Sequence, residues 1–149
     1  MKIRERGFTL IELMTVVVVI SLLVTIAYPS YQEHVRKGNR AEGKGALLRA
    51  AQLEERYFSD QGRYGDITVL RTLFGVAAGG TIYSGESSAA AGKYTITITI
   101  LDAGNTSYRL TATPAAASTD TTAGGCGNLT LTSTGVRDRT GDKPMNQCW

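Results

Sequence analysis

The feature that most constrains this chain is an apolar block near its first residue. From Phe8 to Tyr28 the sequence runs for 21 residues with one charged side chain, Glu12. As a helix the block would extend about 31 Å, at about 1.5 Å per residue, which matches the hydrocarbon thickness of a bilayer. It is also longer than the apolar region of an ordinary secretory signal. We therefore expect a helix that can span a membrane and is retained in the mature protein.

Charge says little about partners or orientation. The formal net charge is +3, but residues 1–7 hold three basic residues and one acidic residue, so 13 of 16 basic and 12 of 13 acidic residues remain without them. A balance of +1 does not indicate a nucleic-acid-binding surface. Three basic residues precede the block and four follow it within 16 residues, so the positive-inside rule does not set its orientation.

The run Gly7-Phe8-Thr9-Leu10-Ile11-Glu12 follows a short basic leader and opens the apolar block. This order strongly resembles the class III signal of type IV prepilins and related pseudopilins. Pro29 also falls where these proteins place a proline. The resemblance implies that a membrane-embedded prepilin peptidase cuts after Gly7 and methylates the new N-terminus at Phe8.

Glu12 also has a physical argument of its own. A carboxylate at membrane depth costs on the order of 3 kcal/mol on insertion scales. The helix dipole would stabilise an acid in the first turn by only about 0.3 to 1 kcal/mol. Two interpretations remain open, a dipole-stabilised acid and an assembly residue, and the second is favoured. The resemblance implies that Glu12 attracts the amine of Phe8 on a neighbouring subunit.

The helical pattern continues beyond Pro29 to about Ser59. Its apolar stripe consists of Ala46, Leu47, Ala50, Ala51, Leu53, Tyr57 and Phe58, with Lys44, Arg49, Glu54 and Arg56 mostly outside it. We expect this half to pack on a domain and Pro29 to kink the helix. The segment before Pro29 is rich in β-branched residues. In the related proteins it can lose helicity, but Ser21 stands where many of them have a glycine.

Strands follow a glycine-rich connector at residues 60–92. Isoleucine and threonine alternate over residues 94–100, and the same alternation of apolar and polar residues recurs over 108–113 and 129–132. An antiparallel sheet with one apolar face needs a cover, which the amphipathic helix can supply. We expect an α+β fold, in which a long N-terminal hydrophobic α-helix packs against a sheet of three or four antiparallel strands. The expected regions are a leader at 1–7, a transmembrane and filament-core helix at 8–29, an amphipathic helix at 30–59, and the αβ-loop, sheet and C-terminal region at 60–149.

Cys126 and Cys148 are the two cysteines of the chain. In an exported domain they indicate one disulfide, and in a cytosolic protein two ordinary thiols. Their position matches the disulfide-bounded C-terminal region of type IV pilins. Major type II secretion pseudopilins generally lack this region, so the match argues against that relative.

Several motifs are weighed and set aside. Gly38–Gly45 meets most of the Walker A spacing, but it ends in glycine and lies inside a helical stretch, where its glycines would instead allow bending or close packing. His34 is the single histidine, so we expect no metal and no cofactor. No nucleophile has an activating constellation, so we expect no enzyme activity.

The chain also has a basic helix face and two N-glycosylation patterns. Arg36, Arg40 and Lys44 share a helix face that could meet DNA or anionic headgroups, but acidic residues interrupt it. Ion pairing between subunits or headgroup contact is favoured over DNA. The patterns at Asn105 and Asn128 are a weak signal.

The resemblance implies a structural subunit of a type IV pilus, of a kind that serves adhesion and twitching motility. The motifs of the first 60 or so residues look most like PilE-type minor pilins, which prime or support assembly. The alternatives are a major pilin of the shaft, and less favoured, a DNA-binding competence pilin, a type II secretion pseudopilin or an anchored enzyme. Expected partners are other pilin subunits, the prepilin peptidase, the inner-membrane assembly platform and the membrane. The head would lie in the periplasm first and on an extracellular filament later.

Overall fold

The computed structural model describes residues 7–85, 92–115, 118, 120 and 124–149. These form two compact units, one that ends at Val35 and one that runs from Arg36 to Trp149. Helix α1, Leu10–Gln61, contributes to both units and contains Pro29. Of the predicted leader, residues 1–6 lie outside the described residues.

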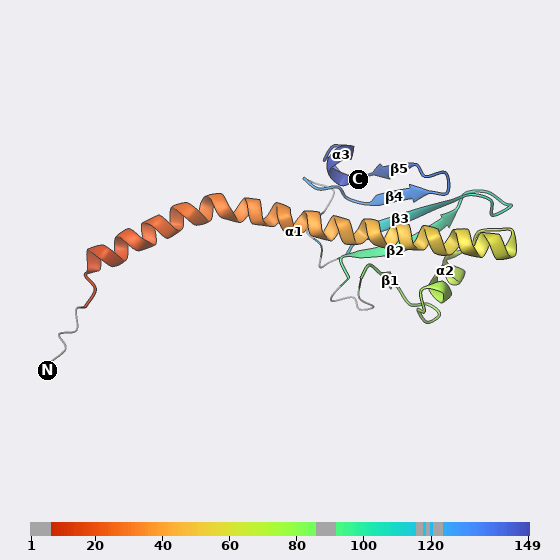
Figure 1. Ribbon diagram of the computed structural model, residues 1–149, viewed down its shortest axis with the longest axis horizontal. Coiled ribbons are helices and arrows are strands. Elements are labelled where there is room, and N and C mark those ends of the chain that lie inside the picture. Colours follow the sequence, from red (N-terminus) through yellow and green to blue (C-terminus); the bar gives the residue numbers. More distant parts are fainter. Residues whose placement is uncertain (1–6, 86–91, 116–117, 119, 121–123) are drawn as a thin grey trace. The chain divides into compact units, whose positions relative to one another are not determined.

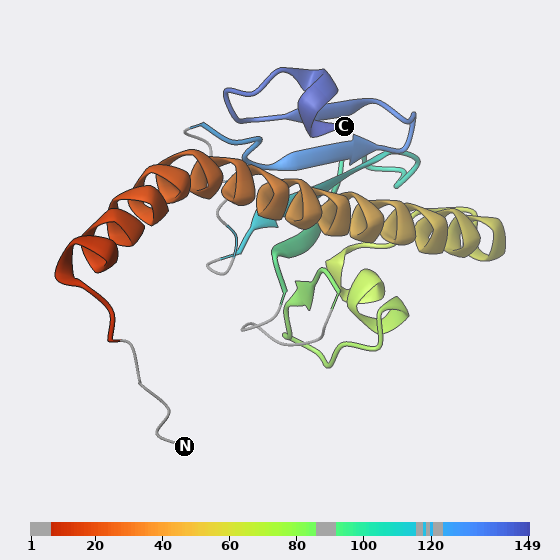
Figure 2. The same cartoon turned by 60° about the vertical axis from the view of Figure 1, so that its left-hand side comes forward.

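The second unit, which we call the head, is built on one antiparallel sheet. Its five strands run in the order β1-β2-β3-β4-β5, so each strand pairs with its neighbours in sequence. The strands are β1 (Ile82–Tyr83), β2 (Tyr94–Ile100), β3 (Tyr108–Pro114), β4 (Leu129–Thr132) and β5 (Arg137–Arg139). Two short helices are added, α2 (Ile67–Leu73) and α3 (Met145–Cys148). Figures 1 and 2 show α2 and β1 at one edge of the sheet and β5 and α3 at the other.

The alternating pattern in the sequence correctly predicted the central strands. Ile98 lies opposite Leu110 and Thr97 opposite Thr111, so apolar and threonine side chains separate onto the two faces of the sheet. The α+β prediction is confirmed, with five strands instead of three or four. The two additional strands, β1 and β5, have only two and three residues, too few for alternation to show.

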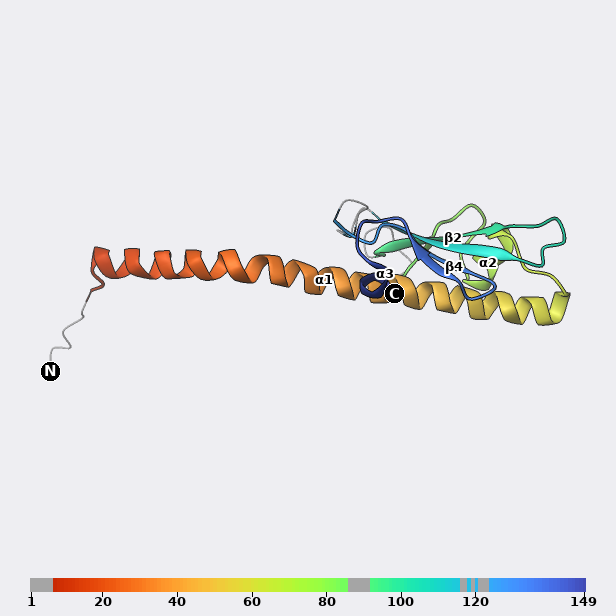
Figure 3. The ribbon, with the colours of Figure 1, turned by 90° about the horizontal axis from the view of Figure 1, so that it is seen from above.

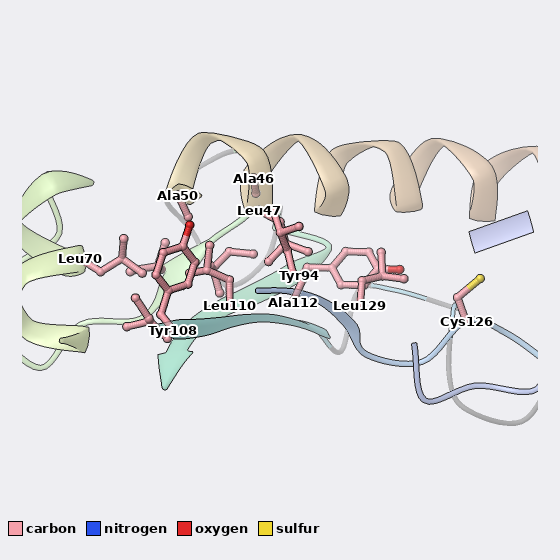
Figure 4. Packing of buried hydrophobic residues seen from close by; sticks show 14 of the residues in the cluster. Ala46, Leu47, Ala50, Leu70, Tyr94, Tyr108, Leu110, Ala112, Cys126 and Leu129 are labelled. Carbon is pink, nitrogen blue, oxygen red and sulfur yellow. The ribbon is translucent and has the colours of Figure 1, made fainter. Parts of the chain in front are cut away.

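The head's part of α1 covers the apolar face of the sheet (Figure 3). Ala46, Leu47 and Ala50 point from the helix toward side chains of β2, β3 and β4 (Figure 4). Leu47 and Ala50 are fully buried, as the helical spacing predicted. The core continues into α2 through Leu70, which is also fully buried. The amphipathic helix and the sheet therefore form two layers around one core.

Candidate assembly and ligand sites

Over residues 8–28 of the first unit most side chains are apolar, and every one of these residues is exposed. Large apolar side chains in the described part of this unit are between 39% and 82% exposed, from Val35 to Phe8. α1 contains a window of mean hydropathy 2.7 in which no residue is buried, and it is long and apolar enough to cross a membrane. A surface of this kind needs lipid or protein around it.

Thr9 caps the start of α1. Its Oγ1 accepts the backbone N–H of Glu12 at 3.3 Å, and its carbonyl accepts the N–H of Leu13 at 3.2 Å. Threonine at this position satisfies one of the free amides of a helix N-terminus. The spacing Thr9-x-x-Glu12 is that of a capping box, so the sequence itself contains the signal for this helix start.

The Glu12 carboxylate is available to a partner outside the chain. Glu12 lies in the first turn of the helix and is exposed. Within the part of the chain that the structure describes, no hydrogen bond or ion pair is formed by its side-chain oxygens. A negative charge therefore stands alone on an apolar surface, which is costly in lipid.

Three hydroxyl groups of the apolar block donate hydrogen bonds within the helix. Thr15, Ser21 and Thr25 donate to carbonyls three or four residues earlier, at 2.8 to 2.9 Å. Such back-bonding hides the hydroxyls, so these residues do not interrupt the apolar surface. Pro29 lies inside α1, where it removes one backbone donor. The charged feature on the surface of the apolar block is Glu12.

A buried polar network joins α1 to the sheet and to the C-terminal region of the head. Arg40 Nη1 lies 3.0 Å from Asp120 Oδ1, and the two side chains are 2% and 0% exposed. Asp120 also accepts the Tyr94 hydroxyl at 2.8 Å and the Cys126 backbone N–H at 3.2 Å. Burial and the bond to Asp120 raise the pKa of Tyr94, so its hydroxyl remains a donor.

The network removes Arg40 from the interrupted basic face that the sequence predicted. Arg36, Arg40 and Lys44 have the right spacing, but Arg40 is buried and neutralised by Asp120. Arg36 and Lys44 are half-buried. A spacing rule gives the direction of a side chain and not what lies opposite it, so the pattern could not reveal the carboxylate from residue 120. This helix face is therefore a poor candidate for contact with DNA or headgroups.

The disulfide joins Cys126 to Cys148 across 22 residues. It ties α3 to the segment before β4, and Gly141 N–H donates to the Cys126 carbonyl at 2.9 Å. Gly141 must be a glycine, since a Cβ there would lie 2.2 Å from the Gly125 carbonyl oxygen. The end of the chain is held as well, because Trp149 Nε1 donates to the Asp138 carbonyl at 2.9 Å. The C-terminal region is thus fixed at several points around the disulfide.

Glu54 is a further buried ionisable group that the sequence did not reveal. The helical pattern placed it mostly outside the apolar stripe, but its side chain is 0% exposed. Burial raises its pKa to about 7, although the backbone N–H of Gly65 opposes the shift. The pattern failed because the turn after α1 folds back over Glu54, which helical periodicity alone does not predict.

The Walker-like run and His34, which were not favoured as functional sites from the sequence, lie on α1. The Walker-like run lies inside α1, and a Cβ on Gly43 would come within 2.8 Å of the Tyr94 ring. That glycine permits close packing, whereas Gly38 and Gly45 face open space. His34 is exposed. Among the described residues, no group of three or more His, Cys, Asp or Glu side chains could hold a metal ion.

A cavity of about 480 Å³ lies between α1 and the segment around β1. Its lining includes the Glu42 carboxylate, the Arg49 guanidinium and the Phe74 ring. Arg49 stacks over Phe74 at 4.9 Å from the ring centroid, and Glu42 Oε1 accepts the Ser84 hydroxyl at 2.6 Å. Both charged groups are thus engaged inside the chain. Among the described lining residues, no nucleophile has an activating base.

Two family models together match most of the chain. The model described as "Prokaryotic N-terminal methylation motif" matches residues 2–28. The model described as "Type IV minor pilin ComP, DNA uptake sequence receptor" matches residues 29–130. With the exposed apolar helix and the α+β head, these matches define a type IV pilin, a class of structural proteins. The chain belongs to the family of the second model, which covers more than half of it.

Individual relatives match shorter parts of the chain. The chain is 40% identical over 63 residues to "Type IV major pilin protein PilA" of Myxococcus xanthus, which is 42% of this chain and 29% of that protein. It is 38% identical over 58 residues to "Fimbrial protein EcpC" of Eikenella corrodens, 39% and 38% of the two chains. It is 46% identical over 43 residues to "Type IV major fimbrial protein FimA" of Dichelobacter nodosus, 29% and 27%. The matched part thus spans well under half of these relatives.

Among solved structures, a type IV pilin from Shewanella oneidensis is similar. The alignment has a TM-score of 0.48 and 25% sequence identity, and it covers 76% of this chain and 97% of that one.

Proposed function

We propose that this pilin is a minor subunit of a type IV pilus, of the PilE-like kind that primes or supports filament assembly. The observation that carries the proposal is the exposed apolar surface of residues 8–28, on which the Glu12 carboxylate has no partner among the described residues. Such a segment can lie in lipid before assembly and against neighbouring subunits afterwards. The head then stands on the filament as the displayed part.

The proposed life cycle begins with processing. The prepilin peptidase cuts after Gly7 and methylates Phe8, as the match to the methylation motif supports. The apolar segment then spans the inner membrane with the head in the periplasm, and the assembly platform moves the subunit into the filament. Intact-mass analysis tests the first step. Loss of residues 1–7 with one added methyl group supports it, and an uncut chain in cells that contain the peptidase contradicts it.

In this proposal Glu12 selects the position of the incoming subunit. Its carboxylate attracts the Phe8 amine of a neighbour, and the attraction is strong because both charges lie in a low-dielectric environment. Glu12→Gln keeps the shape and removes the charge, so processing should persist while incorporation into sheared filaments falls. Glu12→Asp keeps the charge and serves as the matched control. Normal incorporation of the Gln variant would remove this carboxylate from the mechanism.

Copy number separates the minor role from that of the major shaft pilin. A minor subunit should be present at trace levels in purified filaments, and its deletion should reduce piliation. Quantitative mass spectrometry of sheared pili measures the first quantity and microscopy of the deletion strain the second. Abundance at the level of the shaft would replace the minor role with the major one.

A second candidate function is DNA binding by the head. The observation that favours it is the match of residues 29–130 to a family described as a DNA uptake sequence receptor. Against it stands the nearly neutral mature chain, so affinity would come from a local cluster of contacts rather than from overall charge. The full chain in detergent should retain a DNA duplex at low salt. Comparing its retention of one duplex with that of a second duplex, of equal composition and scrambled sequence, tests sequence preference. No retention at low salt would reject this function.

A further inference from the structure

Glu54 lies where the last turns of α1 meet the chain that folds back over them. Its Oε2 accepts the backbone N–H of Gly65 at 2.7 Å. Its Oε1 is buried and has no hydrogen-bond partner. A buried polar atom without a partner is uncommon and needs an explanation.

The chain packs tightly over Glu54 at Gly65, and we call this contact between Gly65 and the end of α1 the closure. A Cβ on Gly65 would lie 2.5 Å from a Val69 methyl carbon and 3.3 Å from Glu54 Oε1, so only glycine fits there. Asp66 follows directly and caps α2 through the N–H groups of Thr68 and Val69. The bond to Gly65 therefore connects α1 to the residue that precedes the first turn of α2.

Tyr64, just before Gly65, is held independently of Glu54. Its N–H donates to the Asn105 carbonyl at 2.8 Å, and its ring packs against Phe58 and Tyr108, with centroids 4.6 Å apart in both pairs. A change in the protonation of Glu54 should therefore alter the structure at Gly65 and in α2 and leave Tyr64 in place.

The groups that face Glu54 are acidic or neutral. Glu55 and Asp66 add negative charge, and both raise the pKa of Glu54. Tyr64 and Tyr108 are neutral phenols, with pKa values raised by burial and by Glu55. In the described part of the head, no basic side chain forms an ion pair with Glu54. The single N–H of Gly65 is thus the one donor that would meet a Glu54 carboxylate.

We propose that Glu54 is a pH-sensitive latch, which holds Gly65 and the start of α2 against α1 when neutral and weakens that closure when ionised. The proposal concerns the head itself and does not rest on the proposed pilus function. The neutral acid can be buried with an unpaired oxygen at modest cost, whereas the carboxylate gains water only when the closure opens.

The sign of the effect follows from proton binding. The closed form keeps its proton up to about pH 7, and the opened form releases it near the ordinary value of 4.5. Between these values the closed form binds more protons, so closure is strongest in acid and weakens as pH rises from 4.5 to 7. Above 7 both forms are ionised and the closure weakens no further.

The test measures hydrogen exchange of the Gly65 amide in the full chain in detergent, corrected for the intrinsic rate at each pH. Protection should fall at least tenfold from pH 5 to pH 7.5, because each unit of pKa difference is a factor of ten. The Leu101 amide, bonded to the Ser107 carbonyl in the β2–β3 hairpin, is an internal reference that should change little. Equal protection of Gly65 at both pH values, or an equal loss at Leu101, would overturn the latch.

Two variants separate Glu54 from its neighbours. Glu54→Gln keeps the shape and stays neutral, so Gly65 protection should no longer depend on pH. Glu55→Gln, at the adjacent exposed carboxyl that accepts the Tyr64 hydroxyl at 3.0 Å, should retain the dependence with a lower midpoint, because Glu55 contributes to the raised pKa of Glu54. If Glu54→Gln does not fold, the carboxyl carbon of Glu54 is titrated directly by NMR in the wild type. A midpoint near 7 supports the latch, and one near 4.5 overturns it.

Discussion

Arg40 and Asp120 form a buried ion pair between residues 80 positions apart, with Nη1 and Oδ1 at 3.0 Å. The pair joins the helix that the head shares with the apolar segment to the segment that precedes the disulfide. Both side chains are almost completely inaccessible. Such pairs add little compared with apolar packing, but breaking one is costly because a charge is left buried.

The first prediction concerns this pair. Asp120→Ala should lower the free energy of unfolding by about 3 to 5 kcal/mol, because Arg40 loses its carboxylate and Tyr94 loses an acceptor. Trp149 is the only tryptophan, so its fluorescence during urea unfolding in detergent reports on the head. Asp60→Ala, at an exposed position on α1, should change the stability by less than about 0.5 kcal/mol. Adding Arg40→Met to Asp120→Ala should recover part of the loss, and no recovery would contradict the ion-pair account.

The second prediction compares two glycines of α1. Gly43→Ala should destabilise the head by about 1 to 3 kcal/mol, since the added methyl group would meet the Tyr94 ring. Gly45→Ala faces open space and should stabilise it by up to about 1 kcal/mol through helix propensity. Urea unfolding measures both. If the two variants shifted stability in the same direction, the packing argument would be wrong.

The third prediction concerns the disulfide. Replacing Cys126 and Cys148 together by serine should cost about 3 kcal/mol, because closing a loop of 22 residues restricts the unfolded chain. The same loss should follow reduction of the wild type with dithiothreitol. The double variant should then show no further loss in reductant. A further loss in the variant would mean that the reductant acts elsewhere.

The fourth prediction is a pH effect in the β2–β3 turn. Hydrogen bonds from Ser107 and Thr106 hold the pKa of Asp102 down at about 2. Ionised Asp102 therefore stabilises the turn above its ordinary pKa of 3.8, and this stabilisation is lost as pH falls through about 2. NMR should show the Thr106 amide resonance, whose proton Asp102 Oδ1 accepts at 3.0 Å, moving with a midpoint near 2. Asp102→Asn should remove that titration, and a midpoint near 4 would contradict the bonding.

Periodic features of this chain could be read from the sequence. The apolar block needs only its length and lack of charge, and the alternation over residues 94–100 defines a strand with one buried face. The stripe with Leu47 and Ala50 at its centre likewise predicted the side of α1 that packs on the sheet. These features are local, because a residue's spacing from its own neighbours fixes the direction of its side chain.

Other features were decided by the tertiary structure. The burial of Arg40 depends on Asp120, and that of Glu54 on the turn that brings Gly65 over it. Strands β1 and β5 are too short for any period and exist because a longer strand lies beside them. In each case the deciding partner is distant in sequence. The sequence by itself therefore determined the apolar segment, the covering helix and the central strands, whereas the buried ionisable groups and the sheet edges were settled by contacts that no local pattern encodes.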